Sequence, residues 1–188
     1  MTKRSRKSTA RHDLARQFLA QARHSLGKQH LPRIVRCLKA LSEDQVWWRP
    51  QATSNSVGNL VLHLAGNVRQ WIVSGLGGEQ DRRERDKEFS ELGPLPRRTL
   101  IRRLESTVSA ADRVLAKLSS TDLAREYSIQ GFQVTGLSAV AHVTEHFAHH
   151  TGQIIYATKL QLGVDLGFTH LPGERAKSWR VSTKLSQH

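Results

Sequence analysis

The sequence predicts an all-α protein built as a four-helix bundle. Four long segments carry apolar residues at three- and four-residue steps, which is the spacing of one buried helix face. Polar or glycine-containing stretches separate these segments, as expected of the connections in a helical bundle. The chain has 188 residues, which suits one domain with a sizeable core.

The first two helices fall in the first half of the chain. The first spans about residues 12–41, with a bend or break near Pro32 because proline lacks the backbone N–H that a helix interior needs. The second begins after Ser54 or Ser56, since either hydroxyl can accept a bond from the first-turn N–H groups. The glycine-rich stretch 74–78 ends this helix.

The second half of the chain contains the other two helices. The charged stretch 79–93 is expected to be a loop, and a third helix covers about 96–118. Residues 125–136 alternate around a central glycine, which indicates a short hairpin or an extended loop. The last long helix runs over about 137–162, with Gly163 as its C-terminal stop.

The N-terminal residues differ in character from the rest of the chain. Residues 1–11 are basic and show no apolar periodicity, so we expect a disordered tail there. Residues 12–188 then form the helical domain, which ends in a surface C-terminal tail containing glycine and proline.

The formal net charge of +13 raises the question of an anionic partner. Five basic residues lie in the first eleven positions, and a second basic group lies in 82–103, where acidic residues are interleaved. Interleaved charges are typical of solvated helix faces, and no nucleic-acid-binding motif has its expected spacing. We therefore attribute the excess positive charge to the N-terminal tail and to solvent-exposed helix faces. Nucleic acid is not the expected partner.

Cysteine usage and hydropathy narrow the class of protein further. The single cysteine, Cys37, excludes an internal disulfide and a cysteine-rich zinc site, and we expect it to be a small buried residue. No apolar run reaches the roughly 18 residues of a membrane span, and no apolar stretch follows the basic N-terminus as in a secretory signal. The expected location is the cytoplasm, with no membrane partner.

The stretch HVTEHFAHHTGQ, residues 142–153, contains four of the ten histidines in the chain. His142, His146 and His150 are four residues apart, so they form one row on a helix face, whereas His149 points elsewhere. Two imidazoles at this spacing can bind one metal ion. No glutamate follows His146, which disfavours a metalloprotease of the HExxH type.

A third ligand would have to come from another helix, and His63 in NLVLHLAGN is the candidate. Burying several imidazoles without partners costs on the order of several kcal/mol, which a divalent ion would offset. The alternative is a polar or pH-sensitive histidine cluster. Gln153 and Asn67 are candidates for hydrogen bonds to ligand imidazoles, although Gln153 could equally bond between helices.

The histidine pattern resembles that of the DinB superfamily, also called YfiT-like metal-dependent hydrolases. The resemblance covers roughly residues 13–168 and rests on two stretches, SNSVGNLVLHLAGNVRQW and EHFAHHTGQI. In that family the second histidine of an HxxxH pair stands just before a tripeptide ending in Gly-Gln, and His150 has this place. Thr151 stands where many members have arginine, a departure from the pattern.

Carried over residue by residue, the resemblance implies His63, His146 and His150 as metal ligands. His142 lies one turn too early for the family pattern. The resemblance also implies an up-down-down-up four-helix bundle, a homodimer, and zinc or nickel between the helices. Some members of the family are thiol transferases, and others have no known activity, including the branch to which this chain is most similar.

Three neutral imidazoles leave a divalent ion its charge and an open position, which is the arrangement of a catalytic site. The hypothesis is therefore a metal-dependent enzyme of the thiol S-transferase or hydrolase type, in which the metal activates a small-molecule thiol or water. No catalytic residue is assigned. The alternatives are a non-catalytic metal-binding or stress-related bundle, and a basic accessory protein whose histidines are structural.

Overall fold

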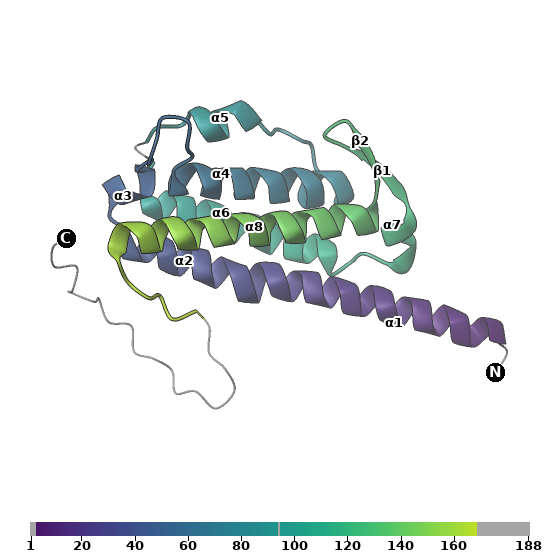
Figure 1. Cartoon of the computed structure of the whole chain (residues 1–188). Helices are drawn as coiled ribbons and strands as arrows, with labels where there is room; N and C mark the ends of the chain where they lie inside the picture. Colours follow the sequence, from purple (N-terminus) through teal and green to yellow (C-terminus); the bar gives the residue numbers. More distant parts are fainter. Residues whose placement is uncertain (1–2, 94, 169–188) are drawn as a thin grey trace.

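The computed structural model describes residues 3–93 and 95–168, with side chains described from residue 13 onward. Long helices dominate this part of the chain, and one two-stranded hairpin is present (Figure 1). The predicted all-α class is confirmed, while the up-down-down-up order of the helices stays a prediction. Most of the predicted C-terminal tail lies outside the described residues.

The first predicted helix is one helical path in three segments. These are α1 (Lys3–His24), the π-helical η1 (Ser25–His30) and α2 (Leu31–Ala40). Pro32 lies in the first turn of α2, and the π segment before it accommodates the missing N–H without a break. The path begins earlier than the expected residue 12, because backbone hydrogen bonds can extend a helix beyond its apolar face.

The next elements are the short helix α3 (Glu43–Trp47), then α4 (Val57–Val68), which continues as the π-helical η2 (Arg69–Leu76). Of the two predicted caps, Ser56 is the one used: its hydroxyl accepts from the Asn59 N–H at 3.1 Å, and the Asn59 side chain accepts from the Ser56 N–H in return. Nearly every residue of α4 is buried, so α4 is the central helix.

The prediction of a loop over 79–93 is wrong in part, because the segment contains helix α5 (Arg85–Ser90). Its buried residue is Glu88, so no apolar periodicity reveals the helix. Tertiary hydrogen bonds hold it instead: the Asn59 amide donates to the backbone oxygens of Glu88 at 2.9 Å and Glu91 at 2.7 Å. The segment therefore lies along α4 (Figure 1).

The other two long helices lie close to their predicted positions. They are α6 (Arg97–Leu115), followed by the short α7 (Ser120–Ala124), and α8 (Gly136–Leu162). Gly163 ends α8 with a φ of 63°, the left-handed conformation that glycine adopts at low cost.

The predicted hairpin is confirmed as an antiparallel pair, β1 (Glu126–Ile129) and β2 (Phe132–Thr135). Its two turn residues, Gln130 and Gly131, have φ values of 55° and 81°. Two consecutive positive φ values are what a tight two-residue hairpin turn requires.

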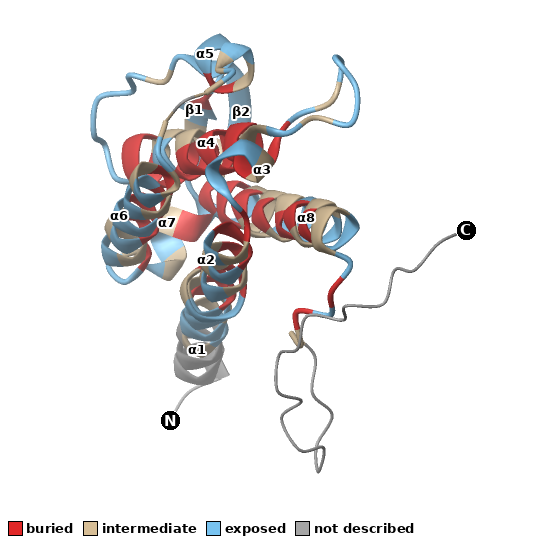
Figure 2. Cartoon of the chain, turned by 90° about the vertical axis from the view of Figure 1, so that its left-hand side faces the viewer, coloured by how far each residue is buried: buried red, intermediate tan, exposed pale blue. Residues whose placement is uncertain are grey.

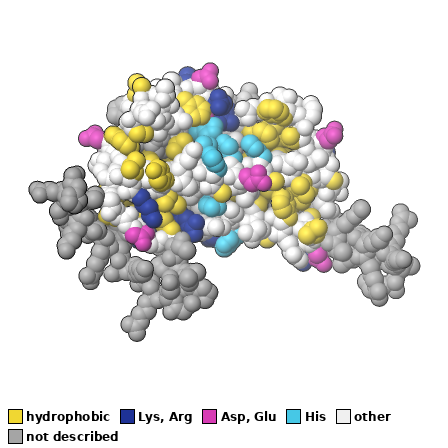
Figure 3. Space-filling view, in the orientation of Figure 1, with side chains coloured by type: hydrophobic (Ala, Val, Ile, Leu, Met, Phe, Trp, Pro, Cys, Tyr) yellow, Lys and Arg dark blue, Asp and Glu magenta, His cyan; other side chains and the backbone are white. Residues whose placement is uncertain are grey.

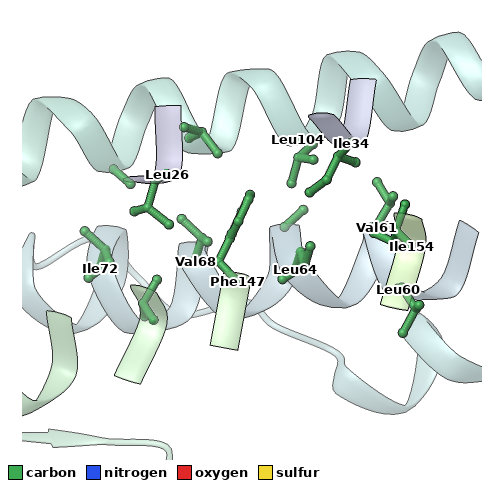
Figure 4. Packing of buried hydrophobic residues seen from close by; sticks show 14 of the residues in the cluster. Leu26, Ile34, Leu60, Val61, Leu64, Val68, Ile72, Leu104, Phe147 and Ile154 are labelled. Atoms are coloured by element: carbon green, nitrogen blue, oxygen red, sulfur yellow. The ribbon is translucent and has the colours of Figure 1, made fainter. Parts of the chain in front are cut away.

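The core lies between η1 and α2, α4, α6 and α8, whose buried faces point inward (Figure 2). Phe147 of α8 is fully buried at its centre, between side chains from the other helices (Figure 4). Cys37 is buried in the core as predicted, and this burial raises the pKa of its thiol to about 11. Among the described helices, none is both long and apolar enough for a membrane span.

Candidate metal centre

The structure brings together three histidines that are distant in the sequence. His63 comes from the middle of α4, and His146 and His150 lie one turn apart on α8. Nε2 of His146 is 3.1 Å from Nε2 of His63 and 3.2 Å from Nε2 of His150. Ring nitrogens of all three lie within 4.8 Å of one another, so the three side chains could hold one metal ion.

The two helices present these imidazoles in different environments. α4 is buried along its length, and His63 is only 6% exposed. α8 buries Phe147 and Ile154 in the core, so His146 and His150 lie at the edge of that apolar face and stay half-buried. Figure 3 shows histidine side chains gathered at the surface over α8. The cluster is therefore accessible from solvent on the α8 side.

A buried carboxylate orients His63. Oε2 of Glu88 lies 3.0 Å from Nδ1 of His63, and Arg83 donates to both oxygens of that carboxylate at 2.8 Å. Nη2 of Arg83 is also 3.1 Å from Nδ1, but it already donates to Oε2 at the shorter distance. A carboxylate only accepts, so Nδ1 carries the proton and Nε2 offers its lone pair to the cluster.

The Arg83–Glu88 pair is shielded from solvent, with side chains that are 4% and 7% exposed. Burial on its own would raise the pKa of the Glu88 carboxyl, but hydrogen bonds from Arg83 and His63 outweigh it and hold that pKa below its usual value. Gly66 makes room for the pair, because a Cβ at this position would lie 1.8 Å from Oε1 of Glu88. Glu88 therefore stays ionised where it contacts His63.

Gln153 fixes the orientation of His150 in the same way. Its side-chain oxygen lies 2.6 Å from Nδ1 of His150, and its amide nitrogen lies 3.2 Å from Nε2 of His149. With the amide placed by these two contacts, Nδ1 of His150 is the donor and Nε2 is left with its lone pair. This is the contact with a ligand imidazole that the sequence suggested for Gln153.

Nε2 of His146 lies between Nε2 of His63 and Nε2 of His150, each of which offers a lone pair. The Nε2 atoms of His63 and His150 both point at its Nε2, which has at most one proton to donate. Hydrogen bonding can therefore satisfy only one of the two contacts at a time. A cation placed among the three Nε2 atoms would satisfy all of them, so the donor set fits a metal ion.

The imidazoles of His146 and His150 are in the neutral form that binds metals. Burial, with the positive charge of neighbouring groups in second place, lowers the pKa of His146 to about 3. Burial also lowers the pKa of His150 below its usual value. Near pH 7 both side chains are therefore uncharged, and binding of an ion does not require either of them to release a proton to solvent.

His142 does not join the cluster, although it lies on the same row of α8. Its ring packs against that of Trp71 at a tilt of 36°, with centroids 4.1 Å apart, and its Nε2 is 3.4 Å from the amide nitrogen of Asn67. Asn67 was expected to contact a ligand imidazole; within residues 3–93 and 95–168 its hydrogen bond goes to His142 instead. Asn67, one turn from His63 on α4, therefore contacts His142 and not the cluster of His63, His146 and His150.

Sequence reasoning missed Arg83 and Glu88. Both lie in the charged stretch 79–93, where basic and acidic residues alternate and the pattern favours solvated side chains. Only the three-dimensional position of the stretch over α4 shows that this one acid is buried. No spacing rule could have selected Glu88 from the other acids nearby.

The all-α fold matches that of DinB-like proteins. The structure is similar to the DinB-like protein YjoA of Bacillus subtilis, with a TM-score of 0.57 and 19% identity, over 77% of this chain and 91% of that one. A DinB-like protein of Bacillus cereus has a TM-score of 0.56 and 17% identity, over 72% of this chain and 87% of that one. The resemblance noted in the sequence is confirmed in the fold.

The sequence itself identifies the family. Residues 13–172 match the family described as "Protein of unknown function (DUF1572)", and the chain belongs to that family. A search of curated proteins gives no match.

Proposed function

We propose that the protein binds one divalent metal ion through Nε2 of His63, His146 and His150, and that it is an enzyme of the thiol S-transferase or hydrolase type. The observation that supports the proposal is the convergence of three Nε2 atoms, two of which have their lone pairs directed inward by Glu88 and Gln153. The ion would be zinc or nickel, since imidazole ligands suit both.

The chain's own residues would supply ligation and orientation. The three imidazoles would hold the ion, and a small molecule arriving from the solvent side of α8 could then bind it as well. Such an ion lowers the pKa of a bound thiol or water and so provides a nucleophile at neutral pH. Glu88 would raise the basicity of His63 as a ligand by accepting its Nδ1–H.

One observation favours a second candidate, a metal-binding bundle without catalysis. Glu88 is the carboxylate that contacts the cluster, but Arg83 occupies both of its oxygens and it is buried. Glu88 is therefore unsuited to remove a proton from a substrate. An enzyme built on this cluster would depend on the ion alone to activate its nucleophile, which suits an acidic thiol better than water.

The substrates in this proposal are a low-molecular-weight thiol and a small electrophile. The homodimer and the cytoplasmic location expected from the sequence belong to the same proposal.

Thiol-dependent turnover of a model electrophile tests the function. Wild-type protein loaded with zinc or nickel is mixed with a panel of small thiols and monobromobimane, beside the His63→Ala variant. The proposal expects turnover above the background of free metal for at least one thiol, and its loss in the variant. Stoichiometric metal binding without turnover of any thiol or hydrolysis of model esters would favour the non-catalytic bundle.

A further inference from the structure

A second candidate site lies beside the metal centre and shares Arg83 and Glu88 with it. A cavity of about 350 Å³ opens between α4, the segment 82–91 and α6. Five arginine or lysine side chains and three glutamates line it, so its walls carry a net positive charge. The buried Arg83 and Glu88 form part of its wall, which gives the cavity a rigid side.

Most of the charges around this cavity are already paired. Three of the five basic side chains have carboxylate partners at 2.8–2.9 Å: Arg69 with Glu79, Arg83 with Glu88, and Lys87 with Glu84. Glu91, the remaining acid of the lining, accepts the backbone N–H of Gly93 at 3.0 Å. A backbone N–H does not neutralise a carboxylate, so among the described residues Arg82, Arg103 and Glu91 are the charges of the lining without an ionic partner, and together they leave a net positive charge.

The two unpaired basic residues are Arg82, which precedes α5, and Arg103, on α6. Nε and Nη2 of Arg82 donate to the amide oxygen of Gln80, at 3.1 and 2.9 Å, which is an uncharged acceptor. The guanidinium of Arg103 has no acceptor anywhere in the described part of the chain. A guanidinium presents a planar fork of donors that matches the oxygens of a carboxylate or phosphate.

Thr107 adds an unused donor on the same wall as Arg103. It lies one turn further along α6, is only 7% exposed and lines the cavity. Buried threonines of α8 behave differently: the hydroxyls of Thr151 and Thr158 each donate to the carbonyl four residues earlier, at 2.7 Å. The Thr107 hydroxyl makes no such bond to any described residue, so it is free to bind a ligand in the cavity.

We propose that this cavity binds a small molecule carrying an oxyanion, a phosphate or a carboxylate, held by Arg82, Arg103 and the Thr107 hydroxyl. Both guanidiniums and the hydroxyl line one cavity, and a bound anion would offset its net positive charge. The apolar side chains that complete the lining, Leu62, Ala65 and Leu95, suit the carbon skeleton of an organic acid or phosphate ester. Arg82, Arg103 and Thr107 take no part in the proposed metal centre, so the proposal does not rest on the metal function.

Isothermal titration of the full-length protein with inorganic phosphate, and in parallel with acetate, tests the proposal at constant ionic strength. The cavity variant is Arg82→Gln/Arg103→Gln. Its matched control is Arg98→Gln/Arg102→Gln, which removes the same charge from exposed positions of α6 outside the cavity. We expect saturable binding of at least one anion, the same Kd in wild type and control, and a Kd at least tenfold weaker in the cavity variant.

The Thr107→Val variant should weaken the same binding by a smaller factor, about three- to tenfold, since one neutral hydrogen bond is lost. Circular dichroism of each variant shows whether it is folded. Absence of saturable binding of either anion to wild type would overturn the proposal. An unchanged Kd in the cavity variant would also overturn it, because the anion would then bind at the histidine cluster or elsewhere.

Discussion

The two ends of the histidine row on α8 lie on one helix face yet have different surroundings. At one end, His146 and His150 meet His63 of α4 and form a cluster of converging nitrogen atoms. At the other end, His142 meets Asn67 and the indole of Trp71. The spacing places all three on one face, but the residue facing each of them on α4 and η2 decides its role.

The difference also extends to the groups behind the imidazoles. His63 and His150 each have an acceptor at Nδ1, provided by Glu88 and Gln153. For His142 the structure shows a tilted contact with Trp71, and the Asn67 amide donates to Nε2 and so uses the lone pair that an ion would need. Lone pairs directed in advance favour a metal site, and the end of the row with His63 and His150 provides two of them.

Replacing one histidine at each end should give the largest contrast. The His63→Ala variant loses one of three ligands, so we expect its zinc affinity to fall by more than about a hundredfold, beyond the usual effect of an outer hydrogen bond. The His142→Ala variant should keep wild-type affinity. Competition titration against a chromogenic chelator measures both zinc affinities. Equal losses of affinity in the two variants would contradict the distinction between the two ends of the histidine row.

Removing Glu88 should affect both stability and metal affinity. The Glu88→Ala variant leaves Arg83 buried without its partner, so we expect the free energy of unfolding to fall by about 3–5 kcal/mol. Zinc affinity should fall by roughly ten- to a hundredfold because His63 loses its acceptor. Urea unfolding and chelator competition measure the two effects. Glu145 is exposed, and Glu145→Ala is the control. Similar losses of stability and zinc affinity in that variant would contradict the role given to Glu88.

Acid should destabilise the metal-free protein through His146. Its folded-state pKa of about 3 lies below the ordinary value of 6.5, so the unfolded chain binds a proton that the folded protein does not. This contribution to stability is complete above about pH 6.5 and is lost as the pH falls toward 3. Urea unfolding at pH 7 and pH 5 measures the free energy of unfolding, which should change less with pH in His146→Leu than in wild type. The same change in both proteins would be inconsistent with this assignment.

Removing the acceptor of His150 should give the smallest effect. Gln153 is exposed, so its replacement costs little stability, and we expect Gln153→Leu to lower zinc affinity by about tenfold, the low end for an outer hydrogen bond. Asn67→Leu, at the other end of the row, should leave the affinity unchanged. Chelator competition measures both affinities. A larger loss of zinc affinity in Asn67→Leu than in Gln153→Leu would contradict the assignment of the metal site to the His146–His150 end of the row.

The sequence predicted the long helices because their apolar periodicity is strong, and it predicted the hairpin from alternation around Gly131. It also predicted the inward histidine row and His63 as its partner, since i and i+4 spacing determines a helix face. It could not predict α5, whose buried residue Glu88 is polar and whose position depends on Asn59. Nor could spacing show that Asn67 faces His142, because the relative position of two helices is a tertiary property.

Elemental analysis of protein purified without a metal-affinity step tests the central claim most directly. Wild type is compared with the His146→Ala/His150→Ala variant, and each is also incubated with zinc or nickel and then desalted. We expect about one metal ion per chain in wild type and almost none in the variant. No metal in wild type, before or after incubation, would contradict the metal centre and leave the histidine row as a structural or pH-sensitive feature.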